Sequence, residues 1–316
     1  MVSAIVDLDP GLVAAAGAFF PDAAGIAAIP FHPNLARVET PTGAMRVHRW
    51  PAQTPESDAA FSHAAIAAMH QAGLTTVPVI AALPGTAETI FRHNGWLYDA
   101  QNWLPGAPPA RAEIEWPDAG QRIELPVTLP ASIFGEIIAV IAQLHDATAG
   151  LIDTPGAPAA PLGMLPGAVE QAQRRHLLTL RPRATREPAI QRWLAVGERL
   201  LATAGPAVLR AAADTAPSST AVHLGLWPSH LLIDGGQLSG VLGWERAAVG
   251  TPLLDLAQAV LRLHGWTDDI VETAIGVYSD LRPLSPIERR LLPAVAALDA
   301  VATTGRLLEQ TFAGGR

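Results

Sequence analysis

AVHLGLWPSHLLIDGGQLSGVLGWERAAVGTPLLDLA, residues 221–257, is the stretch from which the fold of this chain is predicted. Two apolar runs, at 231–233 and 239–244, flank an Asp-Gly-Gly turn at 234–236. This pattern predicts a β-hairpin, because a tight turn needs positive φ angles, which glycine adopts without strain. Leucines at helical spacing after Pro252 predict that a helix follows the hairpin.

The same stretch resembles the catalytic core of the aminoglycoside phosphotransferase and choline kinase-like family, which shares the protein-kinase fold. The family motif runs His-Gly-Asp-Leu, one residue, Pro, one residue, Asn, then a hairpin, Gly-Val-Ile-Asp-Trp-Glu and Gly-Asp-Pro-Leu-Leu-Asp-Leu-Ala. The matching positions here are His223, Leu226, Pro228, Leu232, Gly240, Trp244, Glu245, Gly250, Pro252 and Asp255. The resemblance follows the order of elements over most of the chain, but it is specific only at residues 222–257.

The residues that carry the family's chemistry differ in this chain. Gly225 stands where the resemblance implies a catalytic Asp, His230 where it implies a metal-binding Asn, and Gly243 where it implies the Asp that holds magnesium. Loss of a positioned base lowers a rate by roughly 10²–10⁴-fold. Phosphoryl transfer also depends on magnesium to neutralise the phosphates. We therefore expect the fold without the reaction, with no bound metal and no ATP or magnesium cofactor.

The resemblance implies an α+β, protein-kinase-like fold with two lobes. Residues 1–105 are expected to form an N-terminal lobe of about five antiparallel strands plus a helix, and residues 106–316 a mostly helical C-terminal lobe. Asn102, Trp103 and Leu104 fall at the expected hinge, where backbone groups face the adenine of a true kinase.

Local patterns predict the elements of the first lobe. The predicted segments are a short helix at 10–20, strands at 25–31, 35–40 and 44–50, a helix ending at Gly73, and strands at 77–80, 89–92 and 96–104. Arg46 occupies the family's phosphate-pairing position, or else is a surface arginine on an edge strand. Ser62 replaces the helix Glu that pairs with this basic residue in related sequences.

The second lobe is predicted to be helical around the core stretch. The predicted segments are a loop at 106–129, a helix at 130–148, a connector at 150–166, helices at 167–179, 187–202 and 206–213, and later helices at 266–278, 285–292 and 293–312. Ser285 and Glu288 form a capping-box pattern. His145 is interpreted as a structural histidine, and Asp255 resembles a family residue that braces the loop.

Composition excludes several classes of site. The 316 residues include no cysteine and no lysine, which excludes disulfides, thiolate metal sites and Schiff bases. A net charge of −8 without a basic patch argues against nucleic acid. No apolar run is long enough to cross a bilayer, and acids near the start argue against a secretory signal, so a cytoplasmic protein is expected.

Three functional hypotheses follow. The first is an inactive pseudokinase that binds a small molecule or a protein partner, with Arg46, His223, Trp227, His230 and Glu245 as candidate pocket residues. The second is an atypical ATP-dependent phosphotransferase, acting on a small hydroxylated or amino substrate, in which His230 and Glu245 hold a metal and His223 or a water is the base. The third is a scaffold with a closed cleft, in which Trp227 lies across the nucleotide position.

Overall fold

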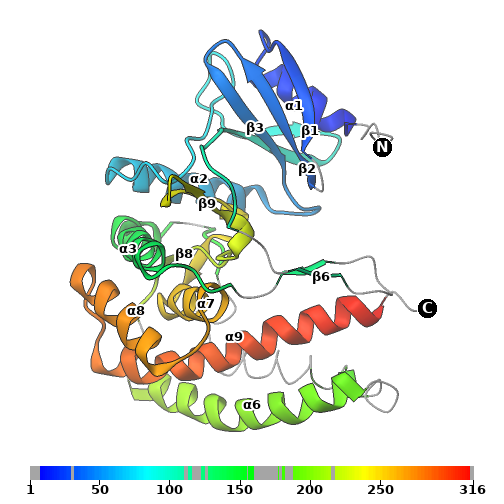
Figure 1. The fold of residues 1–316 in the computed structure, drawn as a ribbon. Helices are drawn as coiled ribbons and strands as arrows, with labels where there is room; N and C mark the ends of the chain where they lie inside the picture. Colours follow the sequence, from blue (N-terminus) through cyan, green and yellow to red (C-terminus); the bar gives the residue numbers. More distant parts are fainter. Residues whose placement is uncertain are drawn as a thin grey trace.

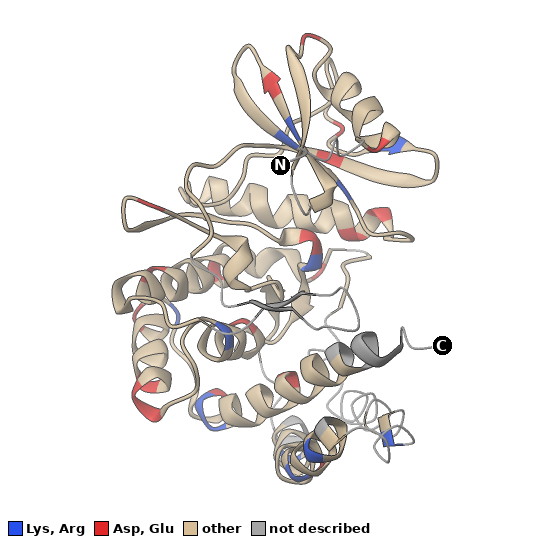
Figure 2. Ribbon diagram, turned by 45° about the vertical axis from the view of Figure 1, so that its right-hand side comes forward, with Lys and Arg blue, Asp and Glu red and all other residues tan. Residues whose placement is uncertain are grey.

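The computed structural model has a strand-rich part and a helical part (Figure 1). It describes residues 8–29, 32–109, 113–115, 122–124, 127–154, 156–159, 177, 180–181, 188–214 and 218–313. Charged residues are sparse along the ribbon, and acids and bases are interspersed (Figure 2). In this part of the chain, no helix combines the length and apolar character needed to cross a membrane.

The strand-rich part is built on an antiparallel sheet in the order β1-β2-β3-β5-β4. Its strands are β1 (Gly25–Ile29), β2 (His32–Thr40), β3 (Gly43–Arg49), β4 (Phe91–His93) and β5 (Trp96–Asn102). Helix α1 (Pro10–Phe19) buries Leu12 and Phe19 against one face of this sheet, and α2 (Glu56–Gln71) lies between the sheet and the helical part (Figure 1). The predicted five-stranded sheet is confirmed.

The strand predicted at 77–80 is wrong, since this segment makes only an isolated bridge between Ile80 and Gln101. It does run beside β5, where the Asn102 amide donates to the Val79 carbonyl at 3.0 Å. Pro78 explains the difference, because proline has no amide proton to give to a ladder.

The helical part contains α3 (Ala131–Ala147), α6 (Pro188–Asp214), α7 (Leu253–Leu263), α8 (Asp268–Leu281) and α9 (Pro286–Ala313), with short 3₁₀ turns η1 (Ala149–Leu151), η2 (Pro228–His230) and η3 (Trp244–Arg246). Its short strands are β6 (Glu113–Glu115), β7 (Arg122–Glu124), β8 (Thr220–Val222), β9 (Leu231–Asp234), β10 (Gln237–Val241) and β11 (Ala248–Gly250). The largest core cluster joins apolar side chains of α3, α7, α8 and α9.

Several predicted boundaries in this part are wrong. The helices predicted at 187–202 and 206–213 form the single helix α6, and those at 285–292 and 293–312 form α9. Pro206 and Pro293 lie inside these helices, and each lacks the amide proton for one helical hydrogen bond. The helices continue past them because the residues on either side are packed against the rest of the protein. The predicted loop at 106–129 contains the pair β6 and β7. The helix predicted at 167–179 lies outside the described residues apart from position 177.

Two local predictions are confirmed. The Ser285 amide donates to Glu288 Oε2 at 2.8 Å and the Glu288 amide donates to Ser285 Oγ at 3.3 Å, which is a capping box. Strands β9 and β10 form the predicted hairpin, and its turn residues Gly235 and Gly236 have φ angles of 56° and 82°.

This hairpin is fixed to the segment that follows β5. Ala107 and Ile233 exchange backbone hydrogen bonds of 3.1 and 2.8 Å, and Ser239 Oγ donates to the Pro105 carbonyl at 2.8 Å. The loops before β9 and after β10 are therefore held beneath the sheet, where they form one side of a cleft.

Candidate functional site

A cleft of about 810 Å³ lies between the sheet and the hairpin β9–β10. Small-molecule sites commonly fall between about 300 and 1,000 Å³. Its lining residues come from both parts of the fold: Ile29, His32, Pro33, Asn34, Leu35, Arg46, His48, Asn102, Trp103, Leu104, Gly106, Ala107, Pro108, Ser229, His230, Leu232, Leu242, Gly243 and Glu245. A volume of this size does not support the closed cleft of the scaffold hypothesis.

Only some of the predicted pocket residues line the cleft. Arg46, His230 and Glu245 do so, together with the three hinge residues. Trp227 does not cover the cleft, because its ring packs under the Arg262 guanidinium of α7 at 4.3 Å. His223 is buried and meets the Trp244 ring edge-on at 4.5 Å. The sequence had no signal for these two orientations, since both depend on tertiary packing.

The three positions that depart from the family motif contact one another. His230 donates from Nδ1 to the Gly225 carbonyl at 2.6 Å. A Cβ placed on Gly243 would lie 2.2 Å from His230 Nδ1, and one placed on Gly225 would lie 2.6 Å from the Gly243 carbonyl. The imidazole therefore occupies the space that a side chain at 243 would need. The three substitutions form one packed unit, which we call the His230 interlock.

The residues present do not fit magnesium, which prefers oxygen ligands. Gly225 and Gly243 offer no side-chain oxygen, and His230 offers an imidazole that is already bonded to a carbonyl. Glu245 is the only acid among the cleft-lining residues. Within the described ranges, no three His, Asp or Glu residues are grouped so that they could hold a metal ion.

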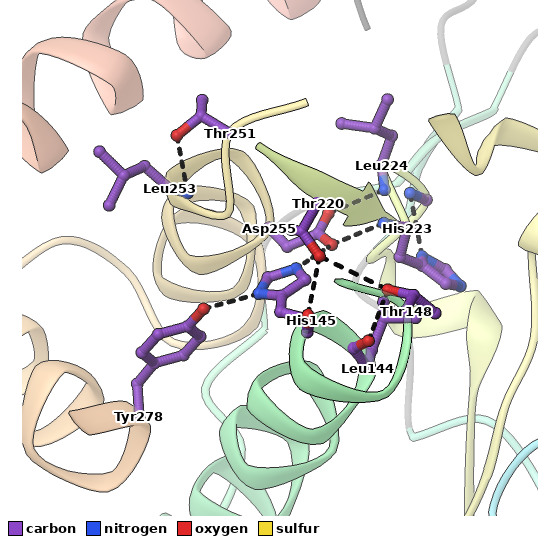
Figure 3. A network of polar contacts seen from close by, with 11 residues as sticks. Leu144, His145, Thr148, Thr220, His223, Leu224, Thr251, Leu253, Asp255 and Tyr278 are labelled. Atoms are coloured by element: carbon purple, nitrogen blue, oxygen red, sulfur yellow. Dashed lines mark hydrogen bonds and ion pairs between the residues drawn. The ribbon is translucent and has the colours of Figure 1, made fainter. Parts of the chain in front are cut away.

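The loop before the interlock is held by Asp255, a fully buried residue of α7 (Figure 3). Its carboxylate accepts hydrogen bonds from the His223 amide at 2.6 Å and the Leu224 amide at 2.8 Å. Leu224 has a φ of +59°, a conformation that is unusual for a residue with a branched side chain. The two bonds to Asp255 therefore support a loop conformation that Leu224 does not favour by itself.

Asp255 also contacts His145, which links the loop to α3 and α8 (Figure 3). The distance from His145 Nε2 to the carboxylate is 3.1 Å, and that from Nδ1 to the Tyr278 hydroxyl is 2.8 Å. Burial lowers the pKa of His145, so the ring is neutral. Nε2–H then donates to Asp255 and Nδ1 accepts from Tyr278, which satisfies every polar atom of this chain of contacts.

Asp255 is ionised in this network. Burial by itself would raise the pKa of Asp255, but the hydrogen bonds that its carboxylate accepts from His145 and from the amide of His223 outweigh burial, and the pKa is lowered. A charged carboxylate is the stronger acceptor for the two loop amides.

His223 is not placed to act as a base in the cleft. Burial lowers its pKa to about 4. The Gly225 amide donates to its Nδ1 at 3.1 Å, so Nε2 carries the proton, and this buried nitrogen has no well-formed hydrogen bond. The ring is therefore a neutral core residue at pH 7.

Arg46 lies on a central strand, not on an edge, so it is not the surface arginine of the alternative interpretation. Its guanidinium donates to Gln101 on β5. Burial lowers the pKa of Arg46, while the charges of Asp99 and Glu245 oppose that effect. Ser62, at the position of the missing helix Glu, instead donates to the Trp244 carbonyl at 2.9 Å.

Asp99, a fully buried acid on β5, was not among the site residues predicted from the sequence. It accepts hydrogen bonds from Trp50 Nε1 at 2.9 Å and from His63 Nε2 on α2 at 3.0 Å. Burial would raise the pKa of Asp99, but the contacts with His48 and His63 hold it well below the usual range. An acid among the apolar residues of β5 was a visible signal, but its partners on β3 and α2 depend on strand register and helix packing.

The contact between His230 and Gly243 can be tested by placing an acid at residue 243. We expect Gly243→Asp to lower the free energy of unfolding by about 1–3 kcal/mol more than Gly236→Asp, because overpacking a filled site costs about that much. Gly236 is a matched control: its φ is +82° against +86° at Gly243, and nothing lies within 4 Å of a Cβ placed there. Urea denaturation of the two variants measures the difference.

A double variant separates the clash from the backbone conformation. His230→Ala removes the imidazole, so Gly243→Asp should cost less in that background, with a coupling of at least about 1 kcal/mol in a double-mutant cycle. If the changes in unfolding free energy are additive in the double variant, or if Gly243→Asp and Gly236→Asp lose equal stability, His230 does not fill this space.

The buried His223 predicts that stability depends on pH between about 4 and 6.5. The unfolded chain binds a proton at this ring below about pH 6.5, whereas the folded chain does so only below about pH 4. Folding stability should therefore rise with pH across this window, by at most about 3 kcal/mol, and level off above it. Urea unfolding from pH 4.5 to 7.5 should show a smaller slope for His223→Gln than for the unmodified chain. His93→Gln, on the β4–β5 hairpin, is the control. If the slope of stability against pH in His223→Gln is the same as in His93→Gln and in the unmodified chain, His223 is not the group responsible for the pH dependence.

Comparisons with known proteins bear on the identity of the fold. The chain is similar to the aminoglycoside phosphotransferase of Alicyclobacillus acidocaldarius, with a TM-score of 0.66 and 16% identity over 98% of this chain and 95% of that one. It is similar to the macrolide 2′-phosphotransferase of Brachybacterium faecium, with a TM-score of 0.57 and 20% identity over 98% and 99% of the two chains. It is also similar to the choline kinase of Streptococcus pneumoniae, with a TM-score of 0.51 and 13% identity over 95% of this chain and 91% of that one.

At these identities the structural likeness shows the fold alone. A comparison with curated protein sequences finds no match. The family model described as the phosphotransferase enzyme family matches residues 32–291, which is most of the chain and includes both sides of the cleft. On this match, the chain belongs to the phosphotransferase enzyme family.

Proposed function

We propose that this chain is a catalytically inactive member of its family that binds a small molecule in the cleft between the two parts of the fold. The observation that carries the proposal is the His230 interlock. Gly225 and Gly243 have no side chain that could act as a base or offer an oxygen ligand, and the His230 ring and the Gly243 carbonyl fill the space in which such side chains would have to lie. A phosphoryl transfer site depends on charge neutralisation and positioning, and neither is provided here.

The cleft itself supports binding rather than a purely structural role. It combines apolar walls with a few polar groups, which is the usual composition of a small-molecule site. Protein contacts between the hairpin β9–β10 and the segment after β5 fix the two sides of the cleft relative to each other. A binding site formed in advance loses little free energy to ordering when the ligand enters.

The atypical enzyme is the competing hypothesis, in which His230 and Glu245 hold a metal. Both residues line the cleft, and the charges of His230, His48 and Arg46 outweigh burial, so that the pKa of Glu245 is lowered. Its weakness is that His230 Nδ1 already donates to the Gly225 carbonyl. Only Nε2 remains for a metal, and magnesium prefers oxygen.

Turnover of ATP distinguishes these two hypotheses. The purified chain is incubated with ATP, with magnesium or manganese, and with an aminoglycoside, a macrolide or choline as acceptor. We expect ADP formation no greater than in a blank without protein, because no group is placed to activate an acceptor or to hold the metal. An active member of the family, assayed in parallel, is the positive control.

Measurable ADP formation that disappears in both His230→Ala and Glu245→Gln would overturn the proposal in favour of the atypical enzyme. ADP formation that persists in both variants would point to a contaminating kinase. The assay would then be repeated after further purification, and the proposal stands only if ADP formation falls to the level of the blank.

A further inference from the structure

Helix α6 packs on α9 along one side and exposes its other side. Leu201 is buried in a cluster with Leu298 of α9. On the opposite side of α6, Arg192, Arg199 and Arg210 are exposed. The first two are seven residues apart and the last two are eleven residues apart, which is about two and three helical turns, so they form one row. We call the exposed side of α6 that carries this row the basic face.

The arginines of the basic face have no acidic partner among the described residues. Arg199 donates to a backbone carbonyl of its own helix at 3.2 Å, and neither Arg192 nor Arg210 is in an ion pair within the described ranges. Glu198, an acid beside them, already pairs with Arg181. The basic face is therefore a row of uncompensated positive charge on a chain whose net charge is −8.

Helix α8 presents the opposite charge on its exposed side. Asp269, Glu272 and Asp280 are exposed, and none of them is in an ion pair in the part of the chain that the structure describes. Asp269 and Asp280 are eleven residues apart, which is the spacing of Arg199 and Arg210 and corresponds to about 17 Å along a helix. We call this side of α8 the acidic face. Rows of opposite charge with equal spacing are electrostatically complementary.

The acidic face also leaves room for a neighbouring helix. Gly276 lies between Asp269 and Asp280 on this face, and nothing lies within 4 Å of a Cβ placed on it. Glycine weakens the interior of a helix relative to alanine, and no contact within the described chain requires a glycine at this position. A glycine does allow another backbone to approach closely. The basic face has small exposed residues as well, Ala195 and Ala202.

Exposed apolar side chains lie beside the charges of both faces. Val196 and Leu209 of α6 are 38% and 40% exposed, and Leu281 of α8 is 48% exposed. These three are half of the six large apolar side chains that are exposed in the described part of the chain. Burying them supplies free energy for association, while the charges fix the orientation of the partner.

We propose that the basic face of α6 binds the acidic face of α8 in a second copy of this chain. Both helices lie on the outside of the helical part, away from the sheet (Figure 1). A two-fold dimer makes the contact twice, because α6 and α8 of one copy meet α8 and α6 of the other. Stable interfaces bury about 800 Å² on each partner, and a doubled contact comes nearer to this area than a single one. The contact involves no residue of the cleft, so its failure would leave the proposed function untouched.

Sedimentation velocity of the full chain measures this association. We expect an equilibrium between monomer and dimer with a dissociation constant in the micromolar range at about 0.1 M salt. Raising the salt to about 1 M shortens the Debye length from about 10 to about 3 Å, so the dissociation constant should rise at least about fivefold. A chain that stays monomeric at millimolar concentration, or that forms species larger than dimers, would overturn the proposal.

Charge exchange tests which faces meet. Arg199→Glu or Glu272→Arg alone places like charges opposite each other, so each variant should raise the dissociation constant at least about tenfold. An equimolar mixture of the two variants should dimerise again, because one contact then has both original charges and the other has both charges exchanged. If the mixture behaves as its two components do alone, these faces are not in contact. Thermal unfolding verifies that both variants are folded.

The open space above Gly276 gives a test that does not depend on charge. Gly276→Gln should raise the dissociation constant at least about tenfold, because the added side chain separates the two helices. Gly17→Gln on α1 is the matched control: Gly17 is also an exposed helical glycine with nothing within 4 Å of an added Cβ. Both variants should raise the melting temperature, since glutamine is the better helix former, so a loss of association is not unfolding. Equal dissociation constants in the two variants would show that α8 lies outside the contact.

Discussion

The carboxylate of Asp255 is the constraint on which the cleft depends. It accepts the amides of His223 and Leu224 and contacts His145, so a single buried charge joins α7, α3 and the loop that carries the interlock. Removing a buried acceptor leaves each of its donors unsatisfied, at about 1–3 kcal/mol for each donor. The loop therefore keeps its conformation, with Leu224 at positive φ, through contacts that have no part in phosphate chemistry.

Because Asp255 accepts two amides of this loop, the conformation of the loop does not depend on side chains at positions 225 and 243. Buried carboxylates close together repel one another unless a cation lies between them. Glycine at 225 and 243 removes that repulsion, and His230 fills the resulting space while donating to the Gly225 carbonyl. This packing makes the three departures from the family motif interdependent. An acid restored at 243 alone meets an imidazole and not a metal site.

The features that could be predicted from the sequence are those set by local chemistry. The hairpin turn at Gly235 and Gly236 and the capping box at Ser285 follow from backbone requirements within a few residues. The features that could not be predicted depend on distant partners. Trp227 was expected in the cleft, but its ring packs under Arg262, which lies on α7 and is 35 residues away in the sequence. Asp99 obtains its donors from Trp50, which directly follows β3, and from His63 on α2, and no local pattern specifies those contacts.

Helix α2 is attached to the sheet on one side and to the loop below it on the other, without an acid at position 62. His63 on α2 contacts Asp99 on β5, and Ser62 on the same helix donates to the Trp244 carbonyl in η3. The carboxylate is thus on the sheet instead of the helix, and a neutral hydrogen bond ties the helix to the loop below. These two contacts fix the helix to both sides of the cleft, so a change at either Asp99 or Ser62 should disturb the position of α2 between the sheet and the loop.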